Sequence, residues 1–169
     1  MKIKFLMLFT VLCFSFQVVS AQTEKQITAI RGEVAAINKN AAKYKKVKKD
    51  VDGVSLEGTE ATYYTSGKGF KKVVANMYGE TFKATGEFYY SGDEIIFAYI
   101  KSHLYDTQIG LSTPVKVVKI TEERYYFSGG EIIRIIDGKK LLKSTAEKFI
   151  ELKEGIVSIN AVLKEGFLK

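Results

Sequence analysis

The chain has little of the chemistry that most enzymes and metalloproteins use. Among its 169 residues there are one cysteine, one histidine, one proline and no tryptophan. A single cysteine cannot form a disulfide within the chain, and the usual zinc sites need three or four nitrogen or sulfur ligands. We therefore expect no metal and no cofactor, and a fold whose stability comes from its hydrophobic core.

Catalytic motifs are also scarce. His103 lies close to Asp106, which would suit a general base, but the sequence offers no nucleophile beside them. Nucleophile elbows, phosphate loops and HExxH motifs are absent. We expect a protein that is not an enzyme, with His103 partly exposed at the end of a strand.

Residues 1–21 predict a secretory signal peptide. Lys2 and Lys4 precede an apolar run that starts at Phe5, and small residues lead up to Ala21. The run is about a dozen residues long, short of the roughly 20 that a membrane-spanning helix needs. We expect cleavage after Ala21, no stable membrane span afterwards, and a single periplasmic or secreted domain over residues 22–169.

The charge is mildly basic and spread along the chain. Lysine and arginine outnumber the acids by 26 to 19, and removal of residues 1–21 takes away two lysines. Nucleic acid is not an expected partner of such an exported chain, whereas an envelope component is. Five lysines surround Val47 between residues 43 and 49, which favours a solvated edge strand over a patch for phosphates or anionic lipids.

Two segments have the spacing of amphipathic helices. Residues 23–44 place apolar side chains at alternating intervals of three and four, and so do residues 149–163. Ser144 and Glu147 have the spacing of a capping box, and Gly166 is placed to end the second helix. Gly155, inside that helix, predicts a bend or a close approach to the sheet.

The middle of the chain repeats one pattern three times. Residues 63–74, 88–99 and 125–136 align on Ser-Gly without a gap, with aromatic residues before it and an apolar or β-branched run after it. Gly67, Gly92 and Gly129 each suit the first central position of a type II′ turn. The repeat predicts three β-hairpins within an antiparallel sheet of six or seven strands.

All six residues over 95–100 are aliphatic or aromatic, so both faces of this strand are apolar. We therefore expect a cover on each side of the sheet. The predicted fold is α+β: an N-terminal helix, an antiparallel sheet of hairpins, and a C-terminal helix packed on the sheet.

Tyrosines supply the candidate binding residues. Adjacent tyrosines in a strand point to opposite faces, so one of each pair looks away from a single core. One interpretation packs the rings and leaves the hydroxyls to polar partners. The other is an aromatic binding face or cleft, and its candidate binding residues, with the histidine, are Tyr63, Tyr89, Tyr99, His103, Tyr105 and Tyr125.

Residues 77–99 and 125–140 resemble a loose group of exported bacterial proteins of unknown function. Their recurring text is of the type YGETG…EYYFxxGxLxFVY…RYYFxxGxLIRWxD, and the likeness covers roughly residues 58–140. This chain departs from it at Phe82 and Ile135, where the group has glycine and tryptophan. The hairpins are also similar to MORN-like repeats, which implies a binding surface. The resemblance brings no catalytic residues.

We therefore expect a binding or interaction protein of the cell envelope that uses the tyrosine-rich sheet face or the loop over residues 102–114. Two alternatives stay open. One is a carrier of an apolar or lipid-like ligand held between sheet and helix, and the other is an inhibitor or immunity partner of an envelope enzyme.

Overall fold

A computed structural model describes residues 22–67, 69–110 and 115–169. The expected signal peptide and residues 111–114 of the predicted loop over residues 102–114 lie outside the described residues. Residues 102–105 of that predicted loop are the end of a strand and not part of a loop. The N-terminal helix covers residues 22–39. The elements that follow are η1 (Ala41–Lys43), β1 (Lys45–Asp50), β2 (Thr59–Ser66), β3 (Gly69–Gly79), β4 (Phe82–Ser91), β5 (Glu94–Tyr105), β6 (Val117–Ser128), β7 (Glu131–Asp137), β8 (Lys140–Leu141) and α2 (Glu147–Leu168).

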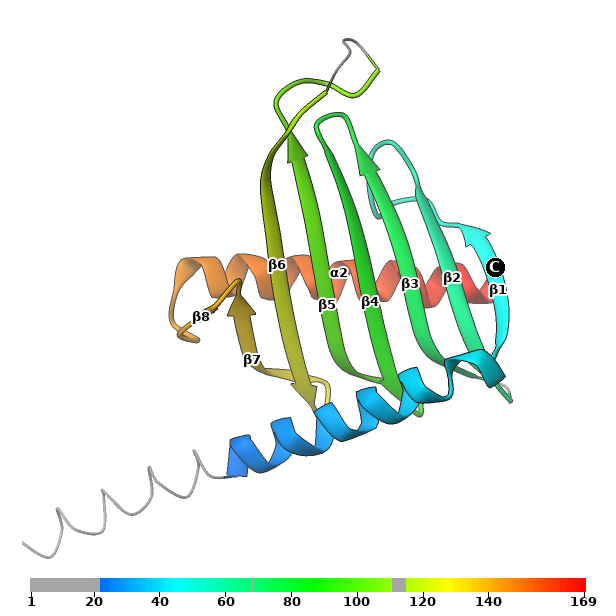
Figure 1. The fold of residues 1–169 in the computed structure, drawn as a ribbon. Coiled ribbons are helices and arrows are strands. Elements are labelled where there is room, and N and C mark those ends of the chain that lie inside the picture. The colour runs from blue at the N-terminus through cyan, green and yellow to red at the C-terminus, as the bar shows by residue number, and fades with distance from the viewer. Residues whose placement is uncertain (1–21, 68, 111–114) are drawn as a thin grey trace, which may run out of the picture.

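The strands form one antiparallel sheet in which each strand pairs with its neighbours in the chain (Figure 1). The order is β1 to β8 without a crossover, and the sheet has eight strands where the sequence predicts six or seven. The extra strand is the two-residue β8. The α+β fold predicted from the sequence is confirmed.

The three repeats form the β2–β3, β4–β5 and β6–β7 hairpins. Gly67, Gly92 and Gly129 have φ values of +66°, +61° and +59°, the conformation that favours glycine in hairpin turns. In the third turn Gly130 also has a positive φ of +80°, which is the pattern of type I′ and not of the expected type II′.

Each hairpin also contains a β-bulge at the same place. The register shifts two residues before the serine, between Tyr64 and Thr65, between Tyr89 and Tyr90, and between Tyr126 and Phe127. The repeat in the sequence is therefore a repeat in strand geometry, including its irregularity.

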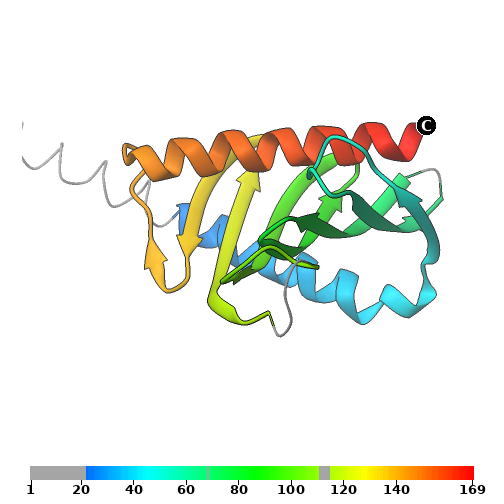
Figure 2. The same ribbon diagram turned by 90° about the horizontal axis from the view of Figure 1, so that it is seen from above.

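One helix covers each face of the sheet, as the two-sided apolar pattern of residues 95–100 predicts (Figures 1 and 2). Helix α2 crosses one face and buries Phe149, Ile156 and Leu163 in the larger core. The aromatic rings of Tyr63, Phe70, Tyr90 and Phe167 pack edge to face or tilted in this layer, with centroids 4.6–5.7 Å apart.

Three expectations for α2 need correction. The helix begins at Glu147 with Ala146 as N-cap and no side-chain cap, so Ser144 forms no capping box. The helix continues through Gly166 to Leu168. Gly155 lies on the exposed side, with no atom within 4 Å of the position its Cβ would take, so it marks no close approach.

The N-terminal helix lies on the opposite face and crosses the ends of the strands near the hairpin turns (Figure 1). Ile27 and Ile30 are buried against Tyr126, with Val34 and Phe97 packed around them. This second core is much smaller than the first.

Strand β1 is an edge strand, as its lysines predict. Val47 packs against the larger core, and the chain leaves the strand at buried Val51. The Lys49 ammonium donates to the carbonyls of Gly166 and Phe167 at 3.2 and 2.8 Å and so joins this edge to the end of α2. In the described part of the chain, no helix has the length and apolar character needed to cross a membrane.

Candidate functional site

The six residues predicted to bind are divided among three environments. Tyr63 and Tyr125 are buried in the core beneath α2, and Tyr89 is buried beneath the N-terminal helix. Tyr99, His103 and Tyr105 are partly exposed along β5. The structure therefore does not gather the six into one site.

The two tyrosines beneath α2 pack their rings and bond their hydroxyls. Tyr63 donates to the carbonyl of Leu163 at 2.8 Å, and Tyr125 donates to the Glu123 carboxylate at 2.7 Å. Burial raises the pKa of Tyr63 to about 12. Burial also raises the pKa of Tyr125, and the Glu123 charge beside it adds to the effect.

A polar cluster fastens the N-terminal helix to the sheet. The ammonium of buried Lys72 donates to Glu87 at 2.7 Å and to the hydroxyl of Tyr89 and the amide oxygen of Asn38 at 3.0 Å each. Tyr89 also donates to Glu87, and Asn38 belongs to the helix. At the other end of the helix Glu24 pairs with Arg134.

Hydrogen bonding outweighs burial in setting the charges of this cluster. Burial raises the pKa of Glu87, but hydrogen bonds from Lys72 and Tyr89 bring it below its usual value. Burial likewise lowers the pKa of Lys72, and the bonds to Glu87 and Tyr89 raise it above its usual value. Lys72 and Glu87 are charged and hydrogen-bonded, and the bonds of Lys72 and Tyr89 to Asn38 connect this pair to the helix.

The N-terminal helix leaves much of its own face of the sheet uncovered. Glu87 lies on this face, since it bonds to Lys72, which also bonds to Asn38 of the helix. Side chains two residues apart on a strand share a face. Register partners on neighbouring strands also share a face. Tyr99, which is paired to Glu87, and Arg124, which is paired to Tyr99, therefore lie on the same face. We call this region the open face, and its side chains include Tyr78, Lys83, Thr85, Tyr99, Lys101, His103, Glu122 and Arg124.

Aromatic rings and cations meet at the β5–β6 part of the open face. The Arg124 guanidinium lies 5.3 Å from the ring centroid of Tyr99 and 3.0 Å from the Glu122 carboxylate. Lys101 is 3.8 Å from the same carboxylate. The neighbouring Tyr99 hydroxyl and the Arg124 guanidinium lower the pKa of Glu122. Nearby, Lys83 lies 5.4 Å from the ring centroid of Tyr78.

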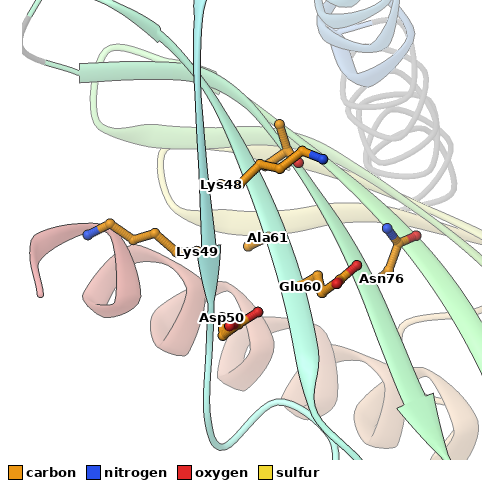
Figure 3. Close-up of a pocket in the computed structure, with 7 residues that line it drawn as sticks. Lys48, Lys49, Asp50, Glu60, Ala61 and Asn76 are labelled. Carbon is orange, nitrogen blue, oxygen red and sulfur yellow. The ribbon is translucent and has the colours of Figure 1, made fainter.

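The β1–β3 part of the open face contains a polar pocket of about 300 Å³ (Figure 3). Lys48, Glu60 and Asn76 rise from this side of the strands, and Lys49 points to the other side, toward α2 (Figure 3). Asp50 and Glu60 are register partners, and the Tyr78 hydroxyl is 3.5 Å from Glu60.

The open face offers recognition chemistry. It presents tyrosine rings and an arginine, which are enriched in protein interfaces, beside lysine and carboxylate side chains that can give a partner charge complementarity. No cluster of three or more histidine, cysteine, aspartate or glutamate side chains able to hold a metal occurs in residues 22–67, 69–110 and 115–169.

Sequence reasoning missed several members of this surface. Tyr78, Lys83, Glu122 and Arg124 were not candidates, because their proximity depends on strand register across β3 to β6. Residues 119–124 are polar at every position except Ile120, and this is the signal that could have marked this part of β6 as exposed.

Comparison with models of protein families, with curated proteins and with solved structures finds no match to the chain. The resemblance to exported proteins with repeated hairpins therefore stays a prediction.

Proposed function

We propose that the protein is a non-enzymatic interaction protein of the cell envelope and that it binds another protein through the open face. The observation that carries the proposal is the unequal cover of the sheet. Helix α2 extends across one face, whereas the other face is covered only near the hairpin turns and presents Tyr78 and Tyr99 beside cations (Figure 1).

A protein partner suits this chemistry better than a small apolar ligand. Tyrosine and arginine are over-represented among the residues that contribute most to protein binding, because they combine a large ring or planar group with hydrogen-bonding capacity. The acids and bases are mixed, which favours a partner with a complementary charge pattern over a uniformly anionic surface. Export to the envelope rests on residues 1–21 and is part of the proposal.

The carrier hypothesis has weaker support. A pocket lined by Ile30, Val34, Phe97 and Tyr126 lies between the N-terminal helix and the sheet, but its volume of about 260 Å³ is below the roughly 300–1,000 Å³ of most ligand sites.

The carrier hypothesis places a ligand between the sheet and a helix, and beneath α2 that layer holds the packed rings of Tyr63, Phe70, Tyr90 and Phe167. The inhibitor hypothesis is a special case of the proposal in which the partner is an envelope enzyme.

Native mass spectrometry of the protein isolated gently from its own cell envelope tests the proposal. We expect a stoichiometric protein adduct, and we expect Tyr78→Ala and Tyr99→Ala each to weaken its binding by about tenfold or more. Glu154→Ala, on the exposed side of α2, is the matched control and should keep the adduct.

Two results would contradict the proposal. An adduct of a few hundred daltons that is lost on denaturation would indicate a carrier. A protein adduct that both tyrosine variants retain would place the binding surface elsewhere.

A further inference from the structure

Strand β6 continues past the end of β7 and leaves part of the sheet edge open. Val117 and residues 119–122 pair with β5 on one side, and Val118 lies at a register shift. On the other side the pairing with β7 starts only at Glu123, and no strand of the described chain lies beside residues 117–121 (Figure 1). This open segment borders the open face, because Ile120 is the register partner of His103, but it does not include Tyr78 or Tyr99.

The backbone of the segment is oriented to receive another strand. The carbonyl of Glu122 accepts a hydrogen bond from Gly138 N–H at 2.7 Å, so the backbone groups of Glu122 point toward the β7 side. Because successive residues of an antiparallel strand alternate between its two neighbours, the N–H and C=O of Ile120 point the same way. Unpaired strand groups of this kind are a template for β-augmentation.

The side chains differ from those of the other sheet edge. Val117, Val118 and Ile120 are 48%, 64% and 54% exposed. Strand β1, at the opposite edge, has lysine at four of its six positions, a pattern that discourages pairing. The β6 segment has one lysine, Lys119, among its apolar residues.

The positive charge beside the segment favours acidic residues in a bound partner. A cleft of about 510 Å³ lies between β6 and the turn after β7. Both of its acids are already paired, Glu122 with Arg124 at 3.0 Å and Asp137 with Lys148. Lys119 and Lys139 also line it and make no ion pair with any described residue, so the cleft has unpaired positive charge.

We propose that residues 117–122 of β6 bind an extended segment of another protein in which apolar and acidic residues alternate. The segment adds as a strand beside β6, in line with β7. Its backbone bonds to the N–H and C=O of Ile120, its apolar side chains pack on Val118 and Ile120, and its acids pair with Lys119 and Lys139.

A short synthetic peptide in which valine and aspartate alternate is the probe. Saturating peptide should slow hydrogen exchange at the Ile120 amide by about tenfold or more, since that amide becomes hydrogen-bonded. An otherwise identical peptide methylated at alternate backbone nitrogens should not bind, and a peptide with lysine in place of aspartate should bind about tenfold more weakly or worse.

Variants of the protein complete the test. Ile120→Pro removes the outward N–H at an edge position where proline is tolerated, and it should abolish binding, whereas Ile120→Thr should retain it. Circular dichroism checks that both variants fold. Tyr78→Ala and Tyr99→Ala should bind the peptide normally, so the outcome is separate from that of the open face.

Three outcomes would overturn the inference. The first is no slowing at millimolar peptide, and the second is equal binding of the methylated peptide. The third is protection of the Ile120 amide that rises with protein concentration without peptide, because a second copy of the chain would then occupy the edge.

Discussion

At the scale of single residues, two glycines of one helix have opposite surroundings. A Cβ at Gly166 would lie 3.0 Å from a methyl carbon of Val51 and 3.2 Å from the Tyr63 hydroxyl oxygen. Gly166 therefore lets the end of α2 approach β1 and β2 closely. Gly155, eleven residues earlier, faces open space.

This difference predicts opposite effects of the same substitution. Gly155→Ala should raise the free energy of unfolding by up to about 1 kcal/mol, because alanine has the higher helix propensity. Gly166→Ala should gain nothing or lower it, because its methyl group meets Val51 and Tyr63. Urea denaturation measures both, and an equal gain in the two variants would contradict the close approach.

At the scale of elements, the hairpin repeat forms the surface on which the N-terminal helix packs. Tyr64, Tyr89 and Tyr126 occupy the same position in their hairpins, next to the bulge. Two of their hydroxyls accept hydrogen bonds from the helix. Asn38 donates to Tyr89 at 3.0 Å, and Arg31 donates to Tyr126 at 3.4 Å. Equivalent positions in successive hairpins thus form a row along which the helix lies.

Weakening the packing of the N-terminal helix should have a local effect on stability, whereas weakening that of α2 should have a global one. Ile27→Ala removes a fully buried side chain from the small core, and we expect the N-terminal helix to lose protection from hydrogen exchange while the sheet keeps it. Leu163→Ala opens a cavity in the large core and should lower the global free energy of unfolding by about 2–5 kcal/mol.

Hydrogen exchange followed by mass spectrometry distinguishes the two responses. Global loss of protection in Ile27→Ala would show that the small core is not a separate cooperative unit. Val157→Ala, at a 44% exposed position on α2, is the control and should change little in either measurement.

At the scale of the whole molecule, the larger core contains ionisable phenols. Tyr63, Tyr90 and Tyr125 are all nearly or fully buried in it. Burial raises the pKa of each, and that of Tyr63 reaches about 12. The folded state therefore holds these groups neutral at pH values where the unfolded chain ionises them.

This predicts loss of stability in alkali. A pKa raised by folding gives stability that is fully present below the unfolded value of 10.0 and is lost as the pH rises toward 12. We expect these tyrosines to ionise only as the protein unfolds, which tyrosinate absorbance and circular dichroism can follow together. Full ionisation near pH 10 with a native dichroism spectrum would contradict the prediction.

Tyr63→Phe tests one of these groups. It should lower the free energy of unfolding by about 1 kcal/mol at neutral pH, since the hydrogen bond to Leu163 is lost. It should also weaken the decrease in stability between pH 10 and 12.

Local patterns in the sequence determined most of the fold. The repeated Ser-Gly turns set the hairpins, the two apolar stripes set the helices, and the apolar residues on both sides of 95–100 required a cover on each face. These features depend on neighbours along the chain, where hydrophobic period and turn chemistry act directly. The lysines around Val47 marked an edge strand for the same reason.

Only the tertiary structure decided which tyrosines are buried, what Gly155 and Gly166 face, and where the sheet stays uncovered. Tyr63 and Tyr99 both lie in segments that the sequence predicts as strands, yet one lies beneath α2 and the other on the open face. Burial depends on which helix crosses which strand and how far β7 extends along β6. These are long-range packing relations, and a local pattern does not specify them.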